Sequence, residues 1–238
     1  LDGVDVGVDD FLRARIPIPS IRTEVDGFSL ISGALGHVDG CGMVCGTGSS
    51  LFARVDGRPA AHIGGLGYLI DTGGSGYELG QAALKRAFRC LDGRDGPTVL
   101  PELLSRALGR DLRQSFSEIY SGGRPFIASL AHTVFEGADM GDRACMEILD
   151  EGSTRLAELT AAAASHFRGE FPVVMNGGIL TSYPNYAAMV RAKAPSRARM
   201  ILAQEPPVYG AVVEALWQTG AAATEEFKRA FMSDYRRR

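Results

Sequence analysis

The sequence has few of the features that mark secreted, membrane or nucleic-acid-binding proteins. Its 238 residues include only four cysteines, none in a C-x-x-C pair. No hydrophobic run is long enough to span a bilayer. The net charge is −3, and the only basic block is the terminal Arg236-Arg237-Arg238, typical of a solvated end. These absences argue against a disulfide framework, a membrane protein and a nucleic-acid partner.

Metal-ligating side chains are also sparse and poorly spaced. Cys41 and Cys45 lie four residues apart in a strand-like segment, where a zinc or cluster site would need partners that the sequence does not supply. The cysteines are therefore interpreted as buried free thiols of a reducing cytoplasm. The histidines show no mutual spacing for a metal, so no metal ligand is predicted. Trp217, the only tryptophan, is predicted to pack in the core.

The residues that are abundant indicate a globular α/β protein. Hydrophobic residues make up 45% of the chain and charged residues 22%. Apolar alternation predicts strands at 41–45, 50–55, 59–63, 172–175 and 199–203. Helical periodicity covers most of 97–167, and further helices are predicted at 27–35, from about 74, at 207–217 and near the C-terminus. Strands, a helical insert and then strand–helix–strand–helix make an α/β pattern.

Three glycine-rich kinks follow predicted strands, at Gly46–Ser50, Gly64–Gly76 and Asn176–Gly178. The hairpin turn between 50–55 and 59–63 needs only Asp56-Gly57, so the first kink is an additional one. Glycines let a backbone approach an anion closely, and the amides then act as donors. An ordinary strand-entry turn is the alternative for any one kink, but three predict a phosphorylated ligand. A short extended run is predicted at 20–25, and Asp26 stands where it ends, before a predicted helix. Such a carboxylate is commonly a helix cap and is also where α/β folds place catalytic acids, and the two roles are compatible.

These segments resemble the N-acetylglucosamine kinase and BadF-type ATPase family of the actin/hexokinase/heat-shock-protein-70 superfamily. "CGTGSS" is similar to that family's second phosphate loop, and "GGLGYLIDTGGSGYELGQAALKRAF" to its sugar-contacting segment. "VVMNGGI" resembles the adenosine motif, "EPPVYGAVVEAL" the closing helix and "EVDGFSLISGAL" the segment with the catalytic aspartate. The order of the motifs agrees over nearly the whole chain. The resemblance implies a ribonuclease-H-like, actin-like ATPase domain with a helical insert at about 97–168.

The resemblance also implies roles for particular residues. Asp26 would be the catalytic base that activates a sugar hydroxyl for attack on the γ-phosphate of ATP. The remaining positions divide into phosphate-binding Gly46, Thr47, Gly48 and Ser49; adenosine-binding Gly177 and Gly178; and sugar-binding Gly65, Asp71, Thr72 and Ser75. ATP and Mg²⁺ are the implied cofactors. The implied partners are a small sugar and a second copy of the chain in a homodimer, with no nucleic acid or membrane.

The sequence departs from the family pattern in three ways. The family's first phosphate loop has no counterpart, so residues 1–38 are expected to be the end of an N-terminal lobe and 39–238 a C-terminal ATPase-like domain. Thr72 stands where the family has an acid, with the nearest carboxylate at Asp71. Leu66 replaces a tryptophan. With one phosphate loop of two, the 238 residues are expected to bind ATP weakly and to catalyse little alone.

Three functions compete at this point. The first is an ATP-dependent kinase of N-acetylglucosamine or a related amino sugar. The second is an ATPase of the dehydratase-activator type, which would need cluster-binding cysteines at a dimer interface. The third is a non-catalytic nucleotide or sugar sensor. Iron absorbance would favour the second, and nucleotide binding without turnover of sugar would favour the third.

Overall fold

The computed structural model describes residues 8–17, 21, 23–71 and 73–237. Its contacts divide the chain into two compact units, one of Leu1–Val38 with Gln204–Arg238 and the other of Asp39–Ala203. The sequence predicted a boundary between residues 38 and 39, with 39–238 as one domain, and this domain division stays a proposal. In these contacts the segment after Ala203 groups with the N-terminal part.

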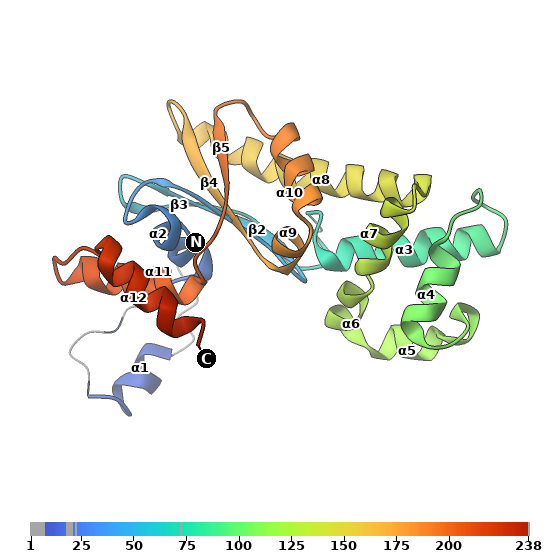
Figure 1. Cartoon of the computed structure of the whole chain (residues 1–238), viewed down its shortest axis with the longest axis horizontal. Coiled ribbons are helices and arrows are strands. Elements are labelled where there is room, and N and C mark those ends of the chain that lie inside the picture. The colour runs from blue at the N-terminus through green and yellow to red at the C-terminus, as the bar shows by residue number, and fades with distance from the viewer. Residues whose placement is uncertain (1–7, 18–20, 22, 72, 238) are drawn as a thin grey trace. The chain divides into compact units, whose positions relative to one another are not determined.

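The larger unit is built on a five-stranded mixed sheet of order β3-β2-β1-β4-β5 (Figure 1). Its strands are β1 (Gly40–Cys45), β2 (Ser49–Val55), β3 (Arg58–Gly64), β4 (Phe171–Asn176) and β5 (Ala198–Leu202). β2 is antiparallel to both of its neighbours, β1 and β3. β4 runs parallel to both of its neighbours, β1 and β5. This mixed order confirms the predicted ribonuclease-H-like arrangement, including the strand at 172–175 beside the hairpin's sheet.

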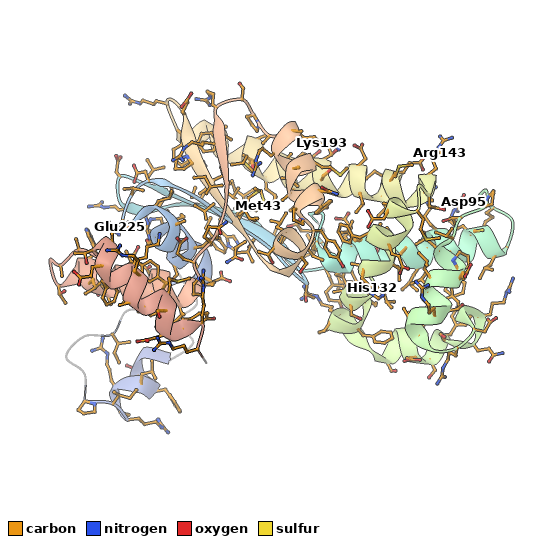
Figure 2. All side chains as sticks on the ribbon, viewed as in Figure 1. Met43, Asp95, His132, Arg143, Lys193 and Glu225 are labelled. Carbon is orange, nitrogen blue, oxygen red and sulfur yellow. The ribbon has the colours of Figure 1, made fainter. Side chains whose placement is uncertain are left out.

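Buried apolar residues explain why β1 and β4 occupy the centre of the sheet. Met43, labelled in Figure 2, is fully buried in the middle of β1, and Val173 and Val174 are fully buried in β4. Central strands need such side chains because helices cover them.

The turn between β2 and β3 sets the geometry of the edge hairpin. Asp56 and Gly57 have φ values of 52° and 69°, as a two-residue type I′ turn requires. Their amides each donate to the Asp39 carboxylate at 2.9 Å.

α3 (Gly76–Leu91), the helix predicted from about 74, follows the hairpin. The helices in the range of the predicted insert are α4 (Leu100–Leu108), the 3₁₀ turn η1 (Leu112–Gln114), α5 (Phe116–Ser121), α6 (Gly123–Ser129), α7 (His132–Asp139), α8 (Arg143–Ala163) and the 3₁₀ turn η2 (Ala164–His166). α4, α6 and α7 pack against α3, whereas α8 contacts α7 at one end and the strands β2 and β3 at the other. Figure 1 shows α8 extending from the sheet to α7 and the other helices of the insert.

After β4 the chain continues through α9 (Gly178–Ser182) and α10 (Pro184–Lys193). α9 lies against β1 and β4, and α10 packs against α8.

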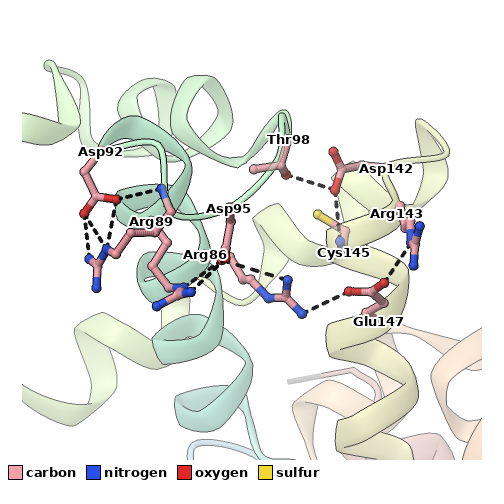
Figure 3. Close-up of polar contacts among 10 residues, drawn as sticks. Arg86, Arg89, Asp92, Asp95, Thr98, Asp142, Arg143, Cys145 and Glu147 are labelled. Atoms are coloured by element: carbon pink, nitrogen blue, oxygen red, sulfur yellow. Dashed lines mark hydrogen bonds and ion pairs between the residues drawn. The ribbon is translucent and has the colours of Figure 1, made fainter.

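Ion pairs join α3 to α8 and to the loop that follows α3 (Figure 3). Arg86 on α3 donates to Glu147 on α8 at 2.9 Å, and Arg89 donates to Asp95 at 2.8 and 2.9 Å. Asp142 caps α8 by accepting from the Cys145 amide at 2.9 Å. It also accepts from the Val99 amide and the Thr98 hydroxyl, both at 2.9 Å.

Asp142→Ala is expected to lower the free energy of unfolding by about 1–2 kcal/mol, because a helix cap and its bonds to the α4 segment are lost. Burial alone would raise the pKa of Asp142, but its hydrogen bonds outweigh burial and hold that pKa below the ordinary value of 3.8. The stabilisation is therefore present above pH 3.8 and fades as the pH falls through the lowered pKa. Urea unfolding at pH 7 measures the change. Equal stability of the variant would contradict this role, and Asp142→Asn, which can still cap, is the matched control.

The smaller unit pairs two helices by close backbone approach. It contains α1 (Val8–Arg13), α2 (Asp26–Leu35), α11 (Pro207–Gln218) and α12 (Glu225–Tyr235). α2 and α11 meet at Gly33 and Gly210, and a Cβ on Gly210 would lie 1.6 Å from the Ser29 carbonyl oxygen. The buried Ser32 hydroxyl donates to Glu214 on α11. Small residues at both positions therefore explain how the two helices come so close.

Two sequence predictions fail in the smaller unit. Residues 21 and 23–25 belong to no strand, so the strand expected before Asp26 is not formed where it is described, although the backbone of Val25 is extended. Trp217 is 47% exposed and stacks on His37, with 3.5 Å between ring centroids, instead of filling a core. Helical spacing alone did not separate a core aromatic from one that lies on the surface of α11.

Candidate active site

A cleft of about 310 Å³ lies in the larger unit beside the turn that joins β1 to β2. Residues from four segments line it: the turn with the adjoining ends of β1 and β2, the loop after β3, the start of α3 and the start of α6. The lining includes Gly46, Thr47, Gly48, Ser49, Ser50, Gly65, Tyr68, Asp71, Ser75, Tyr77 and Arg124. The structure thus brings the predicted phosphate loop and the described sugar-segment residues to one cavity.

The Gly46–Gly48 turn is fixed by backbone hydrogen bonds on both sides. The Gly46 amide donates to the Gly48 carbonyl at 2.8 Å, which closes the turn. The Gly76 amide donates to Gly46 at 2.8 Å and the Tyr77 amide to Thr47 at 3.2 Å, which docks the turn on the first residues of α3. The turn is therefore a preformed part of the cavity wall.

Donor groups on this turn are available to a ligand. Within the described part of the chain, no acceptor takes the amide hydrogens of Thr47 or Gly48. A Cβ on Gly46 would meet nothing within 4 Å, and one on Gly48 would meet only the Arg124 guanidinium, at 3.4 Å. Neither glycine has a positive φ. The fold therefore does not require glycine at either position, and the space beside them remains open to an anion.

Other glycines of the motifs are required by the fold itself. Gly177 has φ +110°, and a Cβ there would lie 2.2 Å from the Cys45 carbonyl oxygen, so the end of β4 can approach β1 only with glycine. Gly65 has φ +73° and would place a Cβ 3.0 Å from that of Ser50. Gly178, at the start of α9, has open space. The adenosine-binding role of Gly177 and Gly178 stays a prediction.

The predicted sugar-contacting residues have different environments. Asp71 is half-buried and lines the cleft, and its amide donates to the Gly67 carbonyl at 2.8 Å. Ser75 is buried and caps α3, accepting from the Glu78 amide at 3.4 Å, while Glu78 accepts from the Gly74 amide in return. Ser75 therefore has a structural function besides lining the cleft. Thr72 lies outside the described residues.

Ser49 and Cys45 flank the turn and face the loop before α3. The buried Ser49 hydroxyl donates to the Gly73 carbonyl at 2.9 Å, so it positions the wall of the cleft. The Cys45 thiol donates to the Gly74 carbonyl at 3.6 Å, and burial raises its pKa to about 12. Cys45 is thus a neutral structural thiol. All four cysteines are free, as the sequence predicted.

Asp26 belongs to the other unit, where it is exposed at the first residue of α2. Val25 is the helix cap and makes no side-chain capping bond, so the interpretation of Asp26 as a side-chain cap is wrong. The Asp26 carboxylate makes no hydrogen bond or ion pair within the described residues, and its role as the catalytic base stays a prediction.

Sequence analysis did not find three side chains that line the cleft: Tyr68, Tyr77 and Arg124. Both tyrosines stand inside the segment that resembles the family's sugar-contacting segment, but nothing in their spacing marks them as lining a cleft. Arg124 follows the Gly122-Gly123 break in the insert, where no local signal marks a binding residue. Only the packing of α6 on α3 brings it to the turn.

A sheet of this order, with an open glycine turn after its first strand and a helical insert after its third, defines an actin-like ATPase domain. The sequence model of the BadF/BadG/BcrA/BcrD ATPase family matches residues 5–215. The chain belongs to this family.

Curated relatives and a solved structure agree with that assignment. The chain is 24% identical over 218 residues to the N-acetylmuramic acid/N-acetylglucosamine kinase of Clostridium acetobutylicum, covering 87% of this chain and 71% of that protein. It is 28% identical over 199 residues to the N-acetyl-D-glucosamine kinase of Dictyostelium discoideum, covering 74% and 62%. A crystal structure described as a candidate N-acetylglucosamine kinase from Chromobacterium violaceum matches with a TM-score of 0.65 and 26% identity, covering 79% and 64%. The chain thus spans about two thirds of these proteins' lengths.

Proposed function

We propose that this chain forms the phosphate-binding part of an ATP-dependent kinase whose substrate is N-acetylglucosamine or a related amino sugar. Two glycines that the fold does not require, Gly46 and Gly48, are the main support. They leave open space beside a turn that lines the cleft, and the Thr47 and Gly48 amides of this turn have no acceptor among the described residues. Amides fixed in this way stabilise the charge that develops on a transferred phosphoryl group. The names of the relatives support the choice of sugar.

The other proposed roles follow the transfer reaction. Asp26 accepts the proton of the sugar hydroxyl as its oxygen attacks the γ-phosphorus, and the bond to the ADP oxygen breaks. Gly65, Asp71, Thr72 and Ser75 contact the sugar, and Gly177 with Gly178 supports the adenosine. Mg²⁺ in such sites is held by phosphate oxygens and one or two carboxylates, and Asp71 is the carboxylate that lines this cleft. Bound Mg²⁺ would neutralise phosphate charge.

The dehydratase-activator alternative is disfavoured by the state of the cysteines. Cys41 and Cys45 are buried in β1, and burial raises the pKa of each thiol to about 12. A cluster needs exposed thiolates at an interface. Cytoplasmic location and a homodimer complete the proposal, supported by the free thiols and by the family resemblance respectively. None of the described helices is long and apolar enough to cross a membrane.

The test is a transfer assay on the gene product that contains this chain. ATP, Mg²⁺ and N-acetylglucosamine are supplied, and the sugar phosphate is detected by mass spectrometry while ADP is followed by a coupled reaction. We expect ADP to form only when sugar is present, with one sugar phosphate for each ADP. ADP formation without sugar would favour an ATPase, and nucleotide binding with no product would favour a sensor. Either result would overturn the kinase proposal.

A further inference from the structure

Among the described residues that line the 310 Å³ cleft, Arg124 is the only lysine or arginine. It stands at the start of α6, and its side chain is half-buried. One guanidinium nitrogen is 3.4 Å from the position that a Cβ on Gly48 would occupy. The guanidinium carbon lies 5.0 Å from the centre of the Tyr68 ring. The cation is therefore held between the phosphate turn and an aromatic ring.

No carboxylate neutralises this guanidinium in the described part of the chain. The ion pairs of the insert involve other arginines, and the Arg124 Nε is buried with no hydrogen-bond partner among the described residues. A buried donor of this kind normally has an acceptor, because leaving it unsatisfied costs about 1–3 kcal/mol. Arg124 also lines the cleft, so a ligand bound there can supply an acceptor to the guanidinium.

A second cavity meets the cleft at the same side chain. It measures about 720 Å³, shares Tyr68, Tyr77 and Arg124 with the cleft, and lies between α3, α5 and α6. Its charged lining within the described residues consists of Lys85, Arg89, Arg94 and Arg124, without a carboxylate. Arg89 and Arg94 are paired to Asp95 and Asp92, which leaves Arg124 and Lys85 as the cations available to a ligand. This chamber has room for a substituent larger than a hydroxyl group.

We propose that Arg124 is an oxyanion-binding residue of this site, a role that rests on the proposed function. A planar guanidinium binds phosphate or carboxylate oxygens through two parallel hydrogen bonds. Two sources supply such oxygens here. One is the terminal phosphate of the nucleotide, held between Arg124 and the Thr47 and Gly48 amides. The other is an anionic substituent of an acidic amino sugar that extends into the chamber.

The test compares Arg124→Gln and Arg124→Lys with the wild type in direct binding by calorimetry. Four probes are titrated separately: ATP, inorganic phosphate, neutral N-acetylglucosamine and its acidic relative N-acetylmuramic acid. If phosphate is the oxyanion, Arg124→Gln weakens ATP and phosphate by about 10- to 100-fold and leaves both sugars unchanged. If the substituent is the oxyanion, only N-acetylmuramic acid weakens by that factor. Arg124→Lys is expected to restore part of the loss in either case, because it keeps the charge without the planar fork.

Arg143→Gln is the matched control, since it removes an exposed arginine that pairs with Glu147 on α8 and does not line either cavity. Thermal unfolding of every variant reports whether the fold survives. Probe affinities within twofold of the wild type in Arg124→Gln would overturn the proposal, as would an equal loss for all four probes. Because these are binding measurements, they separate this failure from that of the kinase proposal, which the transfer assay reports.

Discussion

In the gene product that contains this chain, Asp26→Asn is expected to lower the turnover of sugar by about 10²- to 10⁴-fold while the affinity for ATP stays within about twofold. The amide cannot accept the proton of the attacking hydroxyl, and removal of a general base costs a factor of this size. The change adds no bulk, and Asp26 is exposed with no capping bond to lose, so the fold should be unaffected. Coupled-assay kinetics at saturating sugar, with ATP titrations on the same samples, measure both quantities.

Glu225→Gln is the matched control for Asp26→Asn. Glu225 is also the first residue of a helix in the same unit, so the variant removes the same charge at an equivalent position. We expect it to retain normal turnover. An Asp26→Asn enzyme with near-normal kcat would remove Asp26 from the role of base, and equal losses in both variants would point to a general charge effect.

Gly48→Val is expected to weaken the binding of ATP and ADP by about 10- to 100-fold without a comparable loss of stability. Branched carbons at this position would occupy the open space beside the turn, so we expect phosphate oxygens to reach the Thr47 and Gly48 amides less well. The fold should tolerate the change, because Gly48 lacks a positive φ and a Cβ would contact only the flexible end of Arg124 at 3.4 Å. Calorimetric titration and urea unfolding give the two numbers.

Gly169→Val serves as the control for Gly48→Val. Gly169 also has open space and no positive φ, but it lies before β4 and does not line the cleft. It should bind nucleotide normally. Unchanged nucleotide affinity in Gly48→Val would return the turn to an ordinary connection between two strands.

Local signals predicted most of the sheet and the insert. The Asp56-Gly57 turn fixed the edge hairpin because its backbone conformation matches the twist of paired strands. Alternating and continuous apolar runs located β1, β2 and β4, since buried central strands leave few positions for polar residues. Glycine and hydroxyl residues marked the phosphate turn. In each case the information lay within about ten consecutive residues.

The residues that the sequence missed or assigned wrongly depend on contacts between segments that are distant in the sequence. Arg124 reaches the turn only because α6 packs on α3, and no sequence spacing encodes that approach. Trp217 was taken for a core residue, but its partner on the surface is His37, far away in the sequence. Gly177 has a positive φ and leaves no room for a Cβ beside Cys45 of β1, so the motif alone could not separate packing from ligand binding.

A crystal structure of this chain with a non-hydrolysable ATP analogue tests the central claim most directly. The account predicts terminal phosphate oxygens at about 2.7–3.2 Å from the Thr47 and Gly48 amide nitrogens. The Gly46–Gly48 turn should keep its present hydrogen bonds to Gly76 and Tyr77, because the wall is preformed. Phosphates bound elsewhere on the chain, with those two amides still facing solvent, would contradict the claim that this turn is the phosphate site.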